Sequence, residues 1–265
     1  MKKIIYISIV FLAFANSIFA QADLPITNDA VLLVEAGKLL DAEKKIQTAV
    51  VHKDEKDAPY TWYVKGFIEK EIYKTFEANQ RESEHRKLSV QSIEKSLALD
   101  TKRQYTEMSN ALLRYIAVSY FNDALKRAEE ITKASAQEPE QLYGEFRRIM
   151  RLVNPLTNFE EYDKQIFKIL GQSHYRIWED NIKDQSEALI SNDYFQRVLI
   201  IDPDDCDAIL NLVILHYNQG VYKIRSIDIN TDIGQLIPIQ DSAIRNFMTA
   251  LPYAEKCFRT CPPSV

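Results

Sequence analysis

Residues 208–220 read AILNLVILHYNQG and stand shortly after an Asp-Pro pair at 202–203. Apolar side chains recur in this stretch at three- and four-residue steps, which is typical of one face of an amphipathic helix. The same face continues past Gly220 through Val221 and Ile224. No alternation of apolar and polar residues, which would indicate a strand, competes over a comparable length. The stretch therefore predicts a long helix.

The rest of the chain has the same character. Further apolar stripes lie at residues 31–50, 62–72, 93–99, 112–120 and 166–178. Short polar breaks lie at residues 53–57, 100–103, 154–158, 180–184 and 202–205. The 265 residues include only 6 Gly and 9 Pro, well under the ~7% and ~5% of average usage. A sheet-rich fold of this length would need many more turn residues, so we predict an all-α fold.

The N-terminus has the pattern of a secretory signal peptide over residues 1–22. Lys2 and Lys3 precede an apolar run at residues 4–15, and small residues follow at Ala20 and Ala22. A membrane span is the weaker reading because the run is shorter than the ~20 residues needed to cross a bilayer. Cleavage after Ala20 and cleavage after Ala22 both fit. We expect an exported protein, periplasmic or secreted, that is soluble and has no membrane span after cleavage.

The charge balance disfavours nucleic acid as a partner. The chain has 33 Lys and Arg against 38 Asp and Glu, a formal net charge of −5. Loss of Lys2 and Lys3 with the leader would increase the acidic excess. Binding of a polyanion needs a basic surface that releases counterions. The same argument disfavours a surface of anionic lipid.

Several segments resemble the tetratricopeptide repeat (TPR) family, whose first helix carries a W-x2-L-G-x2-Y pattern. Residues 208–220 resemble the family's common A-W-x-N-L-G…Y-x-x-G wording, in which Leu212 and Tyr217 fit. Ile209 stands there in place of Trp, and Val213 in place of Gly. An earlier unit has Trp62 and Gly66 at the signature spacing but Lys65 in place of the leucine.

The second helices of the family end in a Y-x-x-A-L-x-L-D-P wording, which several further segments resemble. These segments are residues 93–100, 195–203 and 250–258, with degenerate copies at 42–49 and 124–131. The resemblance implies an α-solenoid of antiparallel helix pairs, roughly four to five of them. We expect one such domain over residues 23–265.

Two units are longer than the family spacing, between Trp62 and Asp100 and over residues 223–249. A loop or longer helices could take up the second excess. We favour longer helices because Val221, Ile224 and Asp228 continue one helical face without a polar break. A long C-terminal helix hairpin should then turn near residues 230–234.

The resemblance implies a concave groove lined by the first helices. Its positions in this chain are Tyr63, Phe67 and Lys70 in one unit and Leu210, Ile214, Tyr217 and Asn218 in the last. An aromatic groove with polar edges suits a peptide or a partner helix. The alternative is that these aromatic rings pack against a neighbouring helix. The family's carboxylate clamp is not expected, because Lys70 and Asn211 alone do not make it.

No catalytic or metal motif emerges. The four histidines, at positions 52, 85, 174 and 216, lack metal-ligand spacing. Residues 228–232 resemble the start of a calcium loop, but Ile233 and Ile239 stand at its Gly and Glu positions, so a polar hairpin turn explains them better. We expect no cofactor, no metal and no enzymatic activity.

Cys206, Cys257 and Cys261 are the three cysteines of the chain. Cys257 and Cys261 are four residues apart and share a helix face. A disulfide of Cys206 with either one is expected if the two helices are antiparallel neighbours, and the alternative is three small buried thiols. Taken together, the sequence predicts a protein-binding adaptor or scaffold of the cell envelope. The alternatives are a structural subunit of an assembly and a helical glycan-binding protein or enzyme.

Overall fold

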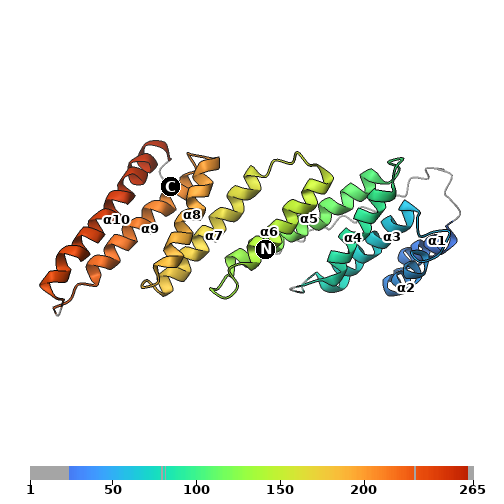
Figure 1. Ribbon diagram of the computed structural model, residues 1–265, viewed down its shortest axis with the longest axis horizontal. Coiled ribbons are helices and arrows are strands. Elements are labelled where there is room, and N and C mark those ends of the chain that lie inside the picture. The colour runs from blue at the N-terminus through green and yellow to red at the C-terminus, as the bar shows by residue number, and fades with distance from the viewer. Residues whose placement is uncertain (1–23, 79, 81, 230, 262–265) are drawn as a thin grey trace, which may run out of the picture. The chain divides into compact units, whose positions relative to one another are not determined.

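The computed structural model describes residues 24–78, 80, 82–229 and 231–261. The predicted signal peptide lies outside these residues. The described part of the chain is helical and contains no strand (Figure 1), which confirms the all-α fold class. Its elements are α1 (Pro25–Glu35), α2 (Leu39–Ala49), α3 (Pro59–Ile72), the π-helical turn η1 (Tyr73–Glu77), α4 (Glu84–Leu99), α5 (Thr106–Glu129), α6 (Glu138–Val153), α7 (Glu160–Asp180), α8 (Gln185–Ile201), α9 (Cys206–Arg225) and α10 (Ile233–Thr260).

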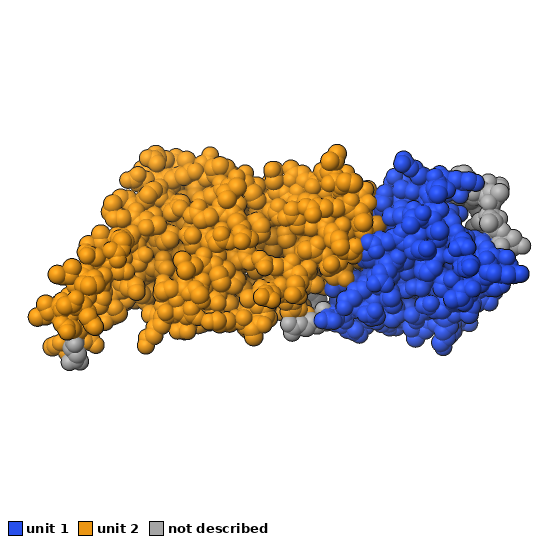
Figure 2. Space-filling model, in the orientation of Figure 1, with its two compact units in different colours: residues 1–112 blue, residues 113–265 orange. Residues whose placement is uncertain are grey.

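The chain divides into two compact units, residues 1–112 and residues 113–265 (Figure 2). In unit 1, α2 packs on α1 and α3, and α4 packs on α3. In unit 2, α8 packs on α7 and α9, and α10 packs on α9. Helices that are neighbours in sequence thus pack as pairs within each unit. A single domain over residues 23–265 stays a prediction.

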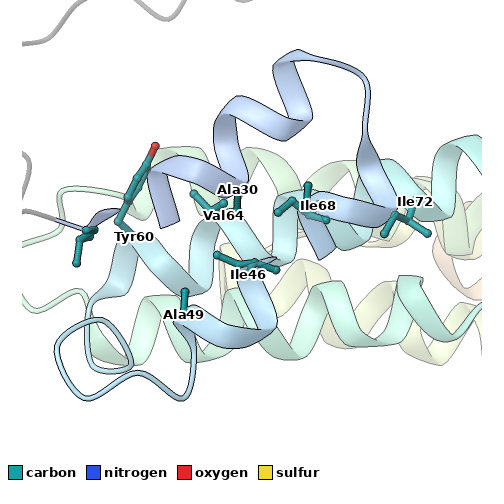
Figure 3. Close-up of a cluster of buried hydrophobic side chains, with 9 residues drawn as sticks. Ala30, Ile46, Ala49, Tyr60, Val64, Ile68 and Ile72 are labelled. Atoms are coloured by element: carbon teal, nitrogen blue, oxygen red, sulfur yellow. The ribbon is translucent and has the colours of Figure 1, made fainter. Parts of the chain in front are cut away.

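The core of unit 1 lies between α1, α2 and α3 (Figure 3). Ala42, Ile46 and Ala49 follow one another at four- and three-residue steps on α2, and each is fully buried. Ala30 of α1 and Ile68 of α3 belong to the same cluster. Small residues at two of the α2 positions let the neighbouring helices approach, while Ile46 fills the space between them.

Side-chain carboxylates hold the starts of three helices. Asp205 accepts a hydrogen bond from the Ala208 N–H at 2.9 Å, and Asp184 accepts one from the Ser186 N–H at 3.1 Å. The buried carboxylate of Glu55 accepts from the N–H groups of Ile26 and Thr27 at the start of α1. Each bond satisfies a donor that the first helical turn leaves without an intrahelical partner.

A glycine on the first helix of three pairs faces a large side chain on the second helix. A Cβ at Gly66 would lie 2.7 Å from the Ile93 side chain, and one at Gly171 would lie 2.8 Å from the Phe195 ring. At Gly220 the distance to the Phe247 ring would be 2.5 Å. In α3/α4, α7/α8 and α9/α10, only the missing side chain lets the two helices approach this closely.

The residue one turn before each large side chain is small and buried. It is Ser89 before Ile93, Ser191 before Phe195 and Ala243 before Phe247. Both serines donate a hydrogen bond of 2.8 Å to the carbonyl of the facing glycine, Gly66 and Gly171 respectively. The same local packing therefore occurs in three helix pairs of one chain.

The expected polar breaks all coincide with connections between helices, and the long C-terminal hairpin is present. α9 ends at Arg225, however, so Asp228 belongs to the connection between α9 and α10 and does not extend the helix. Ile233 and Gly234, which we expected in the turn, lie in the first turn of α10. The stripe at residues 31–50 is also not one helix. Gly37 adopts a positive φ of 73° between α1 and α2, and the N–H groups of Gly37 and Lys38 bond to the last carbonyls of α1. This is how a glycine ends a helix.

Candidate functional site

The expected groove residues of unit 1 lie in one row on α3 but are partly buried. Tyr63 packs against the core cluster of Figure 3, and its ring lies 6.4 Å from those of Tyr60 and Phe67. The Lys70 ammonium lies 4.4 Å from the centre of the Phe67 ring. Burial raises the pKa of Tyr63 to about 12. This row therefore serves partly as packing, the alternative that the sequence left open.

The expected groove residues of unit 2 separate onto two sides of α9. Leu210, Ile214 and Tyr217 are exposed, by 48%, 38% and 54%. Asn218 is half-buried and points toward α7, where its side-chain amide donates a 2.6 Å hydrogen bond to the Tyr175 hydroxyl. The long-range partner Tyr175 gives no local signal in the sequence.

An open pocket of about 370 Å³ lies on the α7 side of α9. Its lining residues come mainly from α7, with one from α9 and one from the end of α5, and all of them except Ile169 have a polar side chain. The lining residues are Glu129, Ile169, Gln172, Ser173, Tyr175, Arg176, Glu179 and Asn211.

Hydrogen bonds fix the shape of this α7–α9 pocket. The Arg176 guanidinium donates to the Glu129 carbonyl at 2.7 Å and to the Ser173 hydroxyl at 2.6 Å. The Tyr175 hydroxyl donates to Glu179 at 2.7 Å, and burial together with this bond raises the pKa of Tyr175 above its usual value. Gln172 is exposed at the pocket. Amide, guanidinium and carboxylate groups beside an aromatic ring can contact both the backbone and the side chains of a peptide.

The start of α9 is held to α7 by ion pairs. Lys168 of α7 lies 3.1 Å from both Asp205 and Asp207. The hydrogen bonds to these carboxylates raise the pKa of Lys168, although burial acts in the opposite direction. The lysine therefore stays charged, and the two first helices that line the pocket are joined at this end as well as at Asn218.

The structure also contains buried ionic groups that sequence reasoning did not single out. Lys65 of α3 pairs with Glu69 one turn later, and Ser92 of α4 donates to the same carboxylate at 2.6 Å. Burial raises the pKa of Glu69, and the attraction of Lys65 opposes that shift. Lys65 in place of a leucine was the signal for this cluster, because Glu69 follows it at the i,i+4 spacing of helical ion pairs.

Two histidines are likewise paired with carboxylates. His85 bonds to Glu77 of η1 at 2.5 Å and to Glu43 of α2 at 3.0 Å. His174 is buried in the α7/α8 pair and bonds to Glu187 at 2.6 Å. All of these groups connect helices within one unit. Among the described residues, no group of three His, Cys, Asp or Glu side chains could hold a metal ion.

A disulfide joins Cys206, at the start of α9, to Cys261, directly after α10, with 5.6 Å between the Cα atoms. Cys257 is a free thiol of intermediate exposure. The structure thus takes the second of the two pairings that the sequence left open. The bond connects the open end of the long hairpin, opposite the turn at residues 226–232.

An exposed apolar surface lies on the α9/α10 hairpin. It consists of exposed residues on both helices, and we name it the outer face. Its members are Leu210, Ile214, Tyr217 and Ile224 of α9 and Ile237, Ile244, Met248 and Leu251 of α10.

No protein-family model matches the chain, and no curated protein is similar to it. Within the part of the chain that the structure describes, no helix is both long and apolar enough to span a membrane. The class of protein therefore follows from the fold and its surfaces, which define an all-helical chain of packed helix pairs.

Proposed function

We propose that this chain is a TPR-like adaptor that binds a protein or peptide and catalyses no reaction. Support for TPR-like pairs comes from the repeated glycine contact. In α3/α4, α7/α8 and α9/α10, a first-helix glycine faces a large residue, Ile93, Phe195 or Phe247, that follows a small one by one turn. That combination of small and large residues is what the family's helix pairs use to approach closely.

The observation that carries the proposed binding site is the α7–α9 pocket. It lies between consecutive first helices, as the TPR resemblance requires for the concave surface. The pocket is open and shallow and is lined by amide, guanidinium and carboxylate groups around Tyr175. An extended peptide would place its backbone against Gln172 and Asn211 and a side chain against Tyr175 and Ile169.

We further propose that the adaptor works outside the cytoplasm, in the periplasm or as a secreted protein. The signal-peptide pattern of residues 1–22 and the disulfide between Cys206 and Cys261 support that location. Disulfides persist mainly in oxidising compartments.

Affinity capture from the cell-envelope fraction tests this proposal, with the wild-type chain and Gln172→Arg as baits. Gln172 is exposed, so its substitution should leave the fold intact while it blocks the pocket. Gln141→Arg, at an exposed position of α6 outside the pocket, is the matched control. We expect a partner that wild type and Gln141→Arg retain and Gln172→Arg loses by about tenfold or more in affinity.

Two results would overturn the proposal. Equal retention of the partner by Gln172→Arg would exclude the pocket as its site. Failure of any protein or peptide to bind the wild-type chain saturably would exclude the adaptor function.

A further inference from the structure

The outer face is directed away from the rest of unit 2. On α9, Leu212 and Leu215 pack toward α8, and Leu210 and Ile214 lie on the opposite side of the helix. On α10, Tyr253 packs against the α8 cluster of Phe195 and Val198.

Ile244, Met248 and Leu251 lie on the side of α10 opposite Tyr253, by the same helical geometry. The Tyr217 and Phe247 rings, with centres 5.5 Å apart, join the two helices along this side. The eight side chains therefore lie on the same side of the hairpin that α9 and α10 form (Figure 1 shows the two helices).

The size of this surface reaches the upper limit of what an isolated protein ordinarily exposes. The exposed fractions of its members, from 38% to 65%, are equivalent to about four complete large side chains. Seven of the eight members are aliphatic, so the lower end of the range for aromatic side chains, about 150 Å² each, is the appropriate figure, and the outer face offers on the order of 600 Å² of apolar surface. The largest patch on a typical monomer is about 300–600 Å². A stable interface buries about 800 Å² on each partner.

The distribution of charge favours a second copy as the occupant. The chain has a formal net charge of −5, so two copies repel each other over most of their surface. The outer face is an exception. Between Leu210 and Tyr222 no Lys, Arg, Asp or Glu occurs, and between Ile233 and Leu251 only Asp241 and Arg245 occur, with opposite signs. Lys223 and Arg225 flank Ile224 at the end of α9, but over the rest of the face two copies can meet without like charges between them.

The packing inside unit 2 supports the same occupant. The apolar faces of α7, α8 and α9 that meet in the α7/α8 and α8/α9 contacts are buried against one another. The outer face also has apolar residues at three- and four-residue steps. No further helix of the described chain packs on it. A two-fold interface needs one patch that is complementary to itself, and a pair of antiparallel apolar stripes satisfies this condition.

We propose that the outer face is a homodimer interface, in which the α9/α10 hairpins of two copies pack face to face as a four-helix layer. The interface is separate from the α7–α9 pocket, so dimer formation does not rest on the proposed binding function.

Sedimentation equilibrium of the wild-type chain at several concentrations tests the dimer. We expect a mass of two chains at high concentration. Ile244→Glu and Met248→Glu place a charge on residues that are 55% and 61% exposed in the single chain, so both variants should fold and remain monomeric. Their dimer dissociation constants should rise by about tenfold to a hundredfold. Ile200→Glu changes an 81% exposed isoleucine of α8 outside the face and should leave the dimer unchanged.

Far-UV circular dichroism of each variant shows whether the helices are retained, and two independent positions guard against the failure of one variant to fold. A wild-type chain that is monomeric at every concentration would overturn the proposal. So would a dimer that both charged variants retain. Binding of a different protein to the outer face of a monomeric chain would also overturn the proposal, because that protein, and not a second copy, would then occupy the face.

Discussion

Removal of the disulfide should weaken unit 2 in a way that depends on which cysteine is replaced. The bond between Cys206 and Cys261 closes a loop with a sequence separation of 55 residues. In the chain-entropy account, a cross-link over a loop of that length lowers the conformational entropy of the unfolded chain by an amount worth about 4 kcal/mol at 25 °C. Cys261→Ser should therefore lower the free energy of unfolding of unit 2 by about that amount.

The choice of background decides what the experiment reports. Cys257 lies one turn before Cys261 and could pair with Cys206 once Cys261 is gone. The comparison should therefore be made between Cys257→Ser, which keeps the disulfide, and the double variant Cys257→Ser/Cys261→Ser. Cys257→Ser alone should change the stability by less than about 1 kcal/mol, because a partly exposed thiol contributes little.

Urea unfolding followed by tryptophan fluorescence gives the two free energies. The chain has two tryptophans, and Trp178 is fully buried beside Leu215 of α9, so its emission in a Trp62→Phe background reports on unit 2. Equal stability of the single and double variants would refute the reasoning. A loss already present in Cys257→Ser would show that Cys257, not Cys261, pairs with Cys206, and non-reducing peptide mapping would identify the bond directly.

Two further perturbations test the packing and the electrostatics. Gly171→Ala should destabilise unit 2 by about 1–3 kcal/mol because its Cβ would lie 2.8 Å from the buried Phe195 ring. Gly144→Ala, whose Cβ would have no atom within 4 Å, should stabilise unit 2 by about 0.5–1 kcal/mol. Thermal unfolding that ranks the two variants in the opposite order would exclude the close helix approach. Burial opposes ionisation of both His85 and Glu77, but their hydrogen bonds outweigh it, so the pKa of His85 is raised above 6.5 and that of Glu77 is lowered below 4.5. The contribution of His85 to the free energy of unfolding is complete below pH 6.5 and is lost as the pH rises through the raised pKa, while that of Glu77 is complete above pH 4.5 and is lost on acidification. The pair should therefore stabilise unit 1 most between pH 4.5 and pH 6.5. In urea unfolding, the His85→Gln variant should not show the loss of stability on the alkaline side.

The sequence predicted the helices better than the places where they end. Breaks that contain several charged residues or an Asp-Pro pair were identified, because such residues cap or stop helices wherever they occur. The break at residues 36–38 was not predicted, since the apolar period continues on both sides of it. Its signal was Gly37, whose positive φ of 73° is a conformation that other residues adopt at a cost. A periodicity count does not register one glycine.

The candidate site depended more on contacts that no local pattern contains. The sequence placed both Tyr63 and Tyr217 in the expected groove, each on the first helix of its pair. The structure partly buries Tyr63 against the core cluster of α1, α2 and α3 but leaves Tyr217 exposed by 54%. The exposure of the two tyrosines differs because different helices pack next to α3 and α9, and this tertiary packing has no local signal in the sequence. Asn218 illustrates the same limit, because its partner Tyr175 is 43 residues away.

α9 is the element on which the two proposed functions meet. Its side toward α7 carries Asn211 and Asn218, which belong to the polar pocket and its hydrogen bonds. Its side away from α8 carries Leu210, Ile214 and Tyr217, which belong to the outer face. A helix turns by about 100° per residue, so residues adjacent in sequence, such as Leu210 and Asn211, reach different surfaces. One stretch of sequence that resembles a repeat signature can therefore supply a polar surface for a peptide and an apolar surface for a second chain, and substitutions on one surface leave the other chemically unchanged.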